Sequence, residues 1–87
     1  MRVILSYDIS SSKQQKLHKE CKKYLIQIHE SVFEGNISIK KINRLKDFIG
    51  RNINCEMDSV VIYYACGPDS FARESIGRAV QSDMLFI

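Results

Sequence analysis

The sequence predicts a single α+β domain, and three observations lead to this prediction. The chain has 87 residues, of which 45% are hydrophobic, a size that suits one core without a second lobe. Strand-like runs of β-branched and apolar residues alternate with two segments whose apolar residues recur every three to four positions. Their order is strand, helix, two strands, helix, strand, followed by a short apolar segment. Residues 1–87 are therefore expected to form one domain.

The first strand is expected at residues 2–7, where the run Val-Ile-Leu is apolar at successive positions. Such a run is typical of a strand covered on both faces, which places it centrally in the sheet. Asp8 ends the run, and Ser10 and Ser12 are candidate N-caps of the next helix. That helix is expected from about Ser12 to Tyr24. Its apolar residues share one face, at Leu17, Cys21, Tyr24 and Leu25, with lysines on the outer side at Lys16, Lys19 and Lys23.

Residues 25–35 change to a strand-like pattern, with β-branched residues at Ile26, Ile28 and Val32. Two short strands or one bent strand fit this segment, because a turn near His29 would contain neither Gly nor Asn. The topology favours two strands joined as a hairpin.

A second helix is expected to follow Ser38 as its N-cap and to end at Gly50. Its exposed side carries basic residues at Lys40, Lys41, Arg44 and Lys46. Asp58 and Ser59 then introduce a buried strand at residues 60–64, and the segment Gly-Pro-Asp at 67–69 breaks it.

The tail from about Phe71 is expected to supply a short extra C-terminal strand and to contribute to a dimer. The chain ends in four apolar residues, Met84 to Ile87. Residues of this kind either complete the chain's own sheet or add to the edge of a partner's sheet.

This order of elements predicts the ferredoxin-like βαββαβ arrangement, an antiparallel sheet with both helices on one face. A domain this small buries only about 60–65% of its unfolded surface, so a partner subunit would add stability. Because the central strands are apolar on both sides, we expect a second copy to cover the open face. The expected assembly is a homodimer packed sheet against sheet.

Composition limits the function classes. Residues 1–54 carry 11 Lys and Arg against 5 Asp and Glu, a net +6, whereas residues 55–87 carry 2 against 5, a net −3. The basic part suits an anionic partner such as a nucleic acid, although solvated lysine-rich helices look the same. No apolar run is long enough for a membrane span, so the protein is expected in the cytoplasm. The cysteines and histidines are widely spaced, which predicts reduced thiols and no local metal pair.

Three segments resemble one known family. They are Ser-Tyr-Asp-Ile at 6–9, Ser-Val-Phe-Glu-Gly at 31–35 and Asp-Ser-Val-Val-Ile-Tyr at 58–63. Together, at this spacing and in a chain of this length, they resemble the Cas2 family of CRISPR adaptation proteins, over nearly the whole chain. The resemblance implies a homodimer in which the two Asp8 carboxylates hold one divalent cation, usually Mg²⁺.

The same resemblance implies function. Family members are described as metal-dependent endonucleases on RNA or double-stranded DNA, and as the bridge of the integrase complex that captures spacers. Asp8 is then the expected catalytic residue and metal ligand, and the alternative from its position alone is a cap of the first helix. Lys13 and Lys16 are expected to contact phosphates, as are Lys40, Lys41 and Arg44, unless they are ordinary solvated side chains.

Three functions remain open from the sequence. The first is a magnesium-dependent endonuclease, the second an architectural bridge that binds duplex DNA and docks an integrase partner, and the third a small-molecule sensor on the same fold. The chain also departs from the pattern of several family members, which have arginines early in the first helix and another before the Ser-Val-Phe segment. Here the corresponding places hold Gln14 or Gln15, Lys16 and Gln27. Glutamine lacks the charge that binds phosphate.

Overall fold

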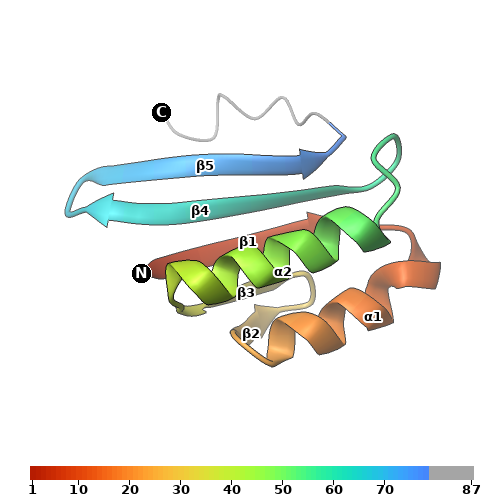
Figure 1. The fold of residues 1–87 in the computed structure, drawn as a ribbon, viewed down its shortest axis with the longest axis horizontal. Coiled ribbons are helices and arrows are strands. Elements are labelled where there is room, and N and C mark those ends of the chain that lie inside the picture. The colour runs from red at the N-terminus through yellow and green to blue at the C-terminus, as the bar shows by residue number, and fades with distance from the viewer. Residues whose placement is uncertain (79–87) are drawn as a thin grey trace.

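Residues 1–78 are described by a computed structural model, in which two helices lie against one antiparallel sheet (Figure 1). The elements in chain order are β1 (Arg2–Asp8), α1 (Ser11–Lys22), β2 (Ile26–His29), β3 (Val32–Asn36), α2 (Ile39–Asn52), β4 (Ser59–Gly67) and β5 (Ser70–Gly77). The ferredoxin-like prediction is confirmed, since the first six of these elements form βαββαβ. None of the helices in residues 1–78 is long and apolar enough to cross a membrane.

The strand order across the sheet is β2-β3-β1-β4-β5. The central position predicted for β1 is confirmed, because it pairs antiparallel with β3 on one side and with β4 on the other. The hairpin expected in residues 25–35 is also confirmed. Its strands β2 and β3 pair antiparallel, and the register shifts between Gln27 and His29. The hairpin forms without Gly or Asn in its turn because β3 is held by β1 on its other edge.

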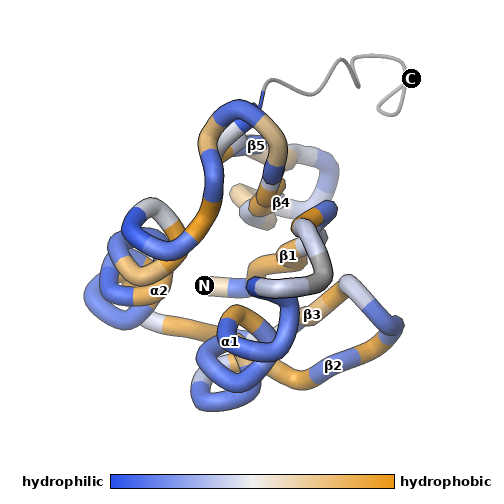
Figure 2. The backbone as a smooth tube through the Cα atoms, turned by 90° about the vertical axis from the view of Figure 1, so that its right-hand side faces the viewer, coloured by the Kyte–Doolittle hydropathy of each residue, from blue (hydrophilic) through white to orange (hydrophobic). Residues whose placement is uncertain are grey.

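Both helices lie on the same side of the sheet, and the core is between them and the strands (Figure 2). Side chains at alternate positions of β1 point into this core, as Val3, Leu5 and Tyr7 do. Tyr7 belongs to this core and is only 8% exposed. The largest wholly buried apolar side chains are Phe33, Leu5, Ile42, Leu45, Ile49, Ile62, Val3 and Val60.

The other face of the sheet is not covered by a helix of residues 1–78 (Figure 2). Strand alternation places Ile4, Val61 and Tyr63 on this open face, where Ile4 lies opposite Tyr63 in the register. Val61 is already buried there, with only 6% of its surface exposed. The predicted sheet-against-sheet homodimer concerns this face and stays a prediction.

Strand β5 extends the chain's own sheet, and its pairing with β4 runs from Ser59 opposite Gly77 to Gly67 opposite Ser70. A polar network ties it to α2. The Tyr64 hydroxyl donates to Glu74 Oε1 at 2.7 Å, and Lys46 Nζ donates to both Glu74 oxygens at 3.0 and 3.3 Å. These donors lower the pKa of Glu74, the Tyr64 hydroxyl most, while burial raises the pKa of Tyr64. The predicted sheet addition by Met84–Ile87 lies outside the described residues.

The helix ends show where local sequence signals succeed and fail. Ser38 caps α2 as predicted, since its Oγ accepts from the N–H of Lys41 at 3.2 Å. The prediction that Gly50 ends α2 is wrong, because the helix continues to Asn52 and Ile53 then enters the core. A side chain at position 50 would meet open space, so nothing there requires glycine.

Helix α1 begins one residue earlier and ends two residues earlier than the predicted Ser12–Tyr24. Ser10 occupies its N-cap position but makes no capping hydrogen bond through its side chain. The predicted position of this cap is right, but the predicted capping hydrogen bond is absent. Instead the Gln14 side chain holds the start of the helix by donating from Nε2 to the Ile9 carbonyl at 2.8 Å.

The three cysteines are free thiols, as the spacing predicted. Cys21 is buried in the core, and this burial raises the pKa of its thiol to about 12. Cys55 and Cys66 are exposed. Because the thiolate is the reactive form, Cys21 is chemically inert at neutral pH.

Candidate metal and nucleic-acid site

Asp8 is the last residue of β1 and lies opposite Ser59 of β4. Its side chain is 81% exposed, and Arg78 Nη2 donates to its Oδ2 at 3.1 Å. Alternation along β1 places the carboxylate on the open face, away from the helices. Asp8 does not cap α1, because no hydrogen bond within residues 1–78 joins its carboxylate to that helix. Asp8 is thus an accessible carboxylate on the face where a second copy is predicted.

Asp58 is a buried carboxylate that organises the backbone beside this position. It is 1% exposed, its Oδ1 accepts the N–H of Ser10 at 3.0 Å, and its Oδ2 accepts the N–H of Asn54 at 2.9 Å. One side chain therefore joins the β1–α1 loop to the α2–β4 loop. The sequence indicated Asp58 only as the start of a strand. No local pattern marks a carboxylate whose partners lie 48 and 4 residues away.

Hydrogen bonds set the charge state of Asp58. The N–H of Asn54 has the largest effect in lowering the pKa of this carboxyl below its usual range, and the N–H of Ser10 acts in the same direction. The positive charges of Lys13 and Arg78 lower it further, while burial opposes them. Asp58 is therefore ionised at neutral pH, and its two oxygens are used within the fold.

Gly77 positions the arginine that reaches Asp8. It has a φ of 91°, and a Cβ at this position would collide with the carbonyl oxygen of Asp58. That carbonyl accepts the N–H of Arg78 at 2.7 Å. Only glycine permits this close approach. The backbone beside Asp58 thus fixes where the Arg78 guanidinium leaves the end of β5.

The predicted basic residues lie on the helices. Lys13 is half-buried in the first turn of α1, at the Asp58 end of the sheet, and Lys16 is exposed one turn further. Lys40, Lys41 and Arg44 are exposed on α2. The structure therefore brings these side chains to the helical layer, whereas the Asp8 carboxylate lies on the opposite face. Sequence reasoning missed Arg78, the basic residue in contact with Asp8.

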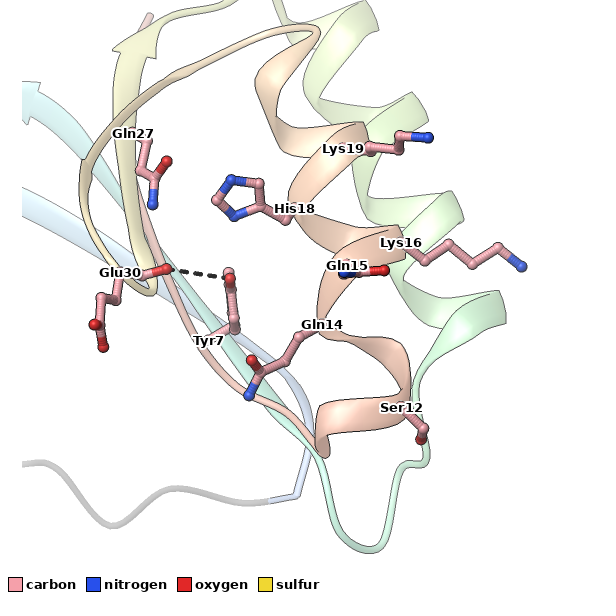
Figure 3. Close-up of a pocket in the computed structure, with 9 residues that line it drawn as sticks. All are labelled: Tyr7, Ser12, Gln14, Gln15, Lys16, His18, Lys19, Gln27 and Glu30. Carbon is pink, nitrogen blue, oxygen red and sulfur yellow. Dashed lines mark hydrogen bonds between the residues drawn. The ribbon is translucent and has the colours of Figure 1, made fainter.

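An open groove of about 990 Å³ lies between α1 and the β2–β3 hairpin. Figure 3 shows Tyr7, His18 and Gln27 facing one another across it. The Tyr7 hydroxyl donates to the Glu30 carbonyl at 3.3 Å. Phe33 lies behind the groove: its ring is stacked on the Tyr7 ring, with 6.2 Å between the ring centroids, and edge-on to the His18 ring, with 5.2 Å between the centroids. Phe33 is wholly buried, so it supports the groove and does not line it.

A metal ion has few protein ligands available in one chain. Within residues 1–78 no group of three or more His, Cys, Asp or Glu side chains is placed to hold an ion. Asp8 offers one exposed carboxylate, whose Oδ2 is shared with Arg78. Mg²⁺ binds to one or two carboxylates and keeps several waters, so a single Asp8 from each of two copies fits its requirements. The more demanding ligand sets of zinc do not fit.

Comparison with known proteins identifies relatives over most of the chain. Residues 1–73 match the family described as CRISPR associated protein Cas2. A "CRISPR-associated endoribonuclease Cas2 2" of Archaeoglobus fulgidus is 33% identical, over 86% of this chain and 82% of that protein. The "CRISPR-associated endoribonuclease Cas2" of Methanocaldococcus jannaschii is 40% identical over 72% of this chain, but the match spans only 55% of that protein. A solved structure described as "Crystal structure of cas2" superposes with a TM-score of 0.69 at 32% identity, over 78% of this chain and 87% of that one.

Proposed function

The chain belongs to the CRISPR-associated Cas2 family, and we propose on that basis that it is a magnesium-dependent endoribonuclease that acts in the cytoplasm during CRISPR spacer acquisition. The observation that carries the proposal is the exposed Asp8 carboxylate at the end of a central strand, beside a guanidinium. The names of the relatives support RNA as the substrate. Asp8 is the proposed metal ligand and catalytic residue.

A homodimer is part of this proposal. The open face supports it, because Ile4, Val61 and Tyr63 lie there without a covering helix from residues 1–78. Two copies joined through this face would bring both Asp8 side chains to the same interface. Their mutual repulsion would be relieved by a bound cation. Mg²⁺ bound there would polarise the phosphodiester and activate a water molecule.

The residues around Asp8 account for substrate placement. Arg78 presents a guanidinium that can bind a phosphate oxygen beside the carboxylate. Lys13 adds positive charge at the same end of the sheet, held half-buried near Asp58. The buried Asp58 keeps the loops on either side of Asp8 in place. Arg78 and Lys13 would thus bind and orient the RNA strand, and the proposal assigns no proton transfer to either of them or to Asp58.

The test of function is cleavage of a labelled single-stranded RNA that depends on magnesium. We expect purified protein to cut the RNA with Mg²⁺, to stop in excess chelator, and to resume when Mg²⁺ is added back. Duplex DNA of the same sequence serves as the second substrate in parallel. Cleavage that continues unchanged in chelator would exclude a magnesium enzyme.

Replacing Arg78 with glutamine is expected to strengthen metal binding at Asp8. The exposed Arg78–Asp8 pair competes with a cation, and pairs of this kind contribute up to about 1 kcal/mol. Its loss should therefore lower the dissociation constant for Mn²⁺, used as a paramagnetic substitute for Mg²⁺, by about two- to fivefold. Line broadening of the Asp8 amide in NMR titrations measures this constant. Unchanged Mn²⁺ affinity would show that Arg78 does not compete for the carboxylate.

A second candidate function is the architectural one, in which the protein binds duplex DNA without cutting it and an acidic C-terminal part contacts an integrase partner. It is favoured by the exposed basic residues that α1 and α2 place in one layer. Changing Lys40, Lys41 and Arg44 together to alanine should then weaken duplex binding and reduce its dependence on salt. If this triple substitution left the affinity for duplex DNA unchanged, the helical layer would not be the surface that binds duplex DNA.

A further inference from the structure

The groove between α1 and the β2–β3 hairpin has no part in the chemistry at Asp8. We propose that it binds the base of one unpaired nucleotide in a nucleic-acid strand, with the strand's phosphates lying along α1. This proposal rests on the proposed function in that it names how an RNA substrate is held. It assigns recognition to a surface of the helical layer, away from the Asp8 carboxylate.

The groove has the size and walls that a nucleotide base requires. Its volume of about 990 Å³ lies at the upper end of ordinary small-ligand sites. The half-buried His18 ring of α1 provides the main ring surface of the groove, and Tyr7 of β1, which is only 8% exposed, contributes a small part of the lining (Figure 3). The His18 ring is held in place edge-on against Phe33 with an interplanar angle of 71°. A flat aromatic ligand can stack on such rings whatever its sequence, as bases do in single-strand binding proteins.

The polar groups of the groove match a base better than a phosphate. Gln15 and Gln27 line it with amides that make no hydrogen bond within residues 1–78. Gln14 uses its Nε2 on the Ile9 carbonyl, which leaves its amide oxygen as an acceptor. An amide offers donors and an acceptor together, which is the pattern of a base edge, whereas a phosphate offers acceptors only.

Charge is placed at the outer margin of the groove. Lys16 and Lys19 line it from α1, and residues 11–23 carry 5 Lys against 1 Glu. Figure 3 shows these two lysines extending from α1 on the side away from the gap, while Gln27 and His18 occupy the gap itself. The Glu30 carboxylate points away from Tyr7, and only the Glu30 carbonyl faces it. Phosphates can thus follow the lysines while a base enters the uncharged gap.

The ligand must be unpaired. In a duplex the base edges are already paired and the faces are stacked, so a base reaches an aromatic wall only from a single strand or a loop. The groove between helix and hairpin is open to solvent. A single-stranded nucleic acid is accordingly the class of ligand that this surface fits.

The test measures binding in chelator, so that no cleavage takes place. A fluorescent hexamer of uridine is compared with a hexamer in which every base is removed and the sugar–phosphate chain is kept. We expect the uridine hexamer to bind at least about tenfold more tightly, since each stacked base contributes this order of affinity. Gln27→Ala, a change at an exposed residue of β2, should reduce that difference, because it removes an amide that can hydrogen-bond to the base.

The controls separate the groove from the surface charge. Lys16→Ala should weaken both hexamers by the same factor, and Asn43→Ala on the exposed side of α2 should change neither. In NMR titrations, uridine 5′-monophosphate should shift the side-chain amide signals of Gln27, and ribose 5-phosphate should not. Equal binding of the two hexamers by the wild type would overturn the proposal, as would a Gln27→Ala variant that keeps the full difference. A protein that fails to cut RNA but retains the preference would contradict only the proposed enzyme function.

Discussion

Replacing Asp8 with asparagine is expected to lower magnesium-dependent RNA cleavage about 100-fold or more. Asparagine keeps the shape of the side chain but removes the charge that attracts a hard cation. The fold should be unaffected, because Asp8 is 81% exposed and loses only its surface pair with Arg78. Initial cleavage rates over a range of Mg²⁺ concentrations give the measurement, and thermal unfolding confirms that the variant is folded.

The matched control for this variant is Asp69→Asn, which changes the same group in the exposed turn between β4 and β5. It should cleave at the wild-type rate, since position 69 lies at the other end of the sheet from Asp8. A contaminating nuclease would leave all three preparations equally active. Once a contaminating nuclease has been excluded, equal activity of the wild type and Asp8→Asn would remove the metal site from the proposed mechanism.

Asp58→Ala is expected to lower the free energy of unfolding by about 2–4 kcal/mol. The change leaves the N–H groups of Ser10 and Asn54 without their buried acceptor. Asp58→Asn should cost about half as much, because its amide oxygen can still accept one of these two bonds. Urea denaturation monitored by circular dichroism gives both values. Two variants as stable as the wild type would show that solvent satisfies these donors equally well.

The acid stability of the protein should depend on the same carboxylate. The pKa of Asp58 is lowered in the folded state, whereas an unfolded Asp has a pKa of about 3.9. The contribution of Asp58 to the free energy of unfolding is therefore fully present above the pKa of the unfolded Asp, and it is lost as the pH falls through the pKa of the folded state. The pKa of Glu74 is also lowered in the folded state, so Glu74 likewise stabilises the fold less at acidic pH, and it does so in the wild type and in both Asp58 variants. The difference in unfolding free energy between wild type and Asp58→Asn should accordingly shrink on acidification below about pH 4. A difference that stays constant would contradict the assignment.

The regular elements could be predicted because their signals are local. The apolar run of β1, the three-to-four-residue repeat of α2 and the Ser38 cap each depend on residues close in sequence, and the structure confirms them. The end of α2 was predicted wrongly at Gly50. Glycine permits a helix to end but does not require it, and burial of Ile53 decided the outcome.

The candidate site was only partly predictable. The end of β1 at Asp8 followed from the pattern, and the metal proposed there came from family resemblance. Its contact with Arg78 joins residues 70 apart in the sequence, and no periodicity or motif announces such a pair. The groove was missed for a related reason, since Gln27 and His18 come from different elements and meet only through the packing of the hairpin on α1.

The central position of β1 also has a consequence for folding during synthesis on the ribosome. Strand β1 is synthesised before its two neighbours β3 and β4, and the pairing with β4 joins Asp8 to Ser59. Contacts of such long sequence separation slow folding, because the intervening chain must be closed into a loop. Residues 1–8 therefore leave the exit tunnel long before either neighbour is available. The Asp8–Arg78 contact forms only after Arg78 has been synthesised, so a nascent chain interrupted before β5 would lack this contact.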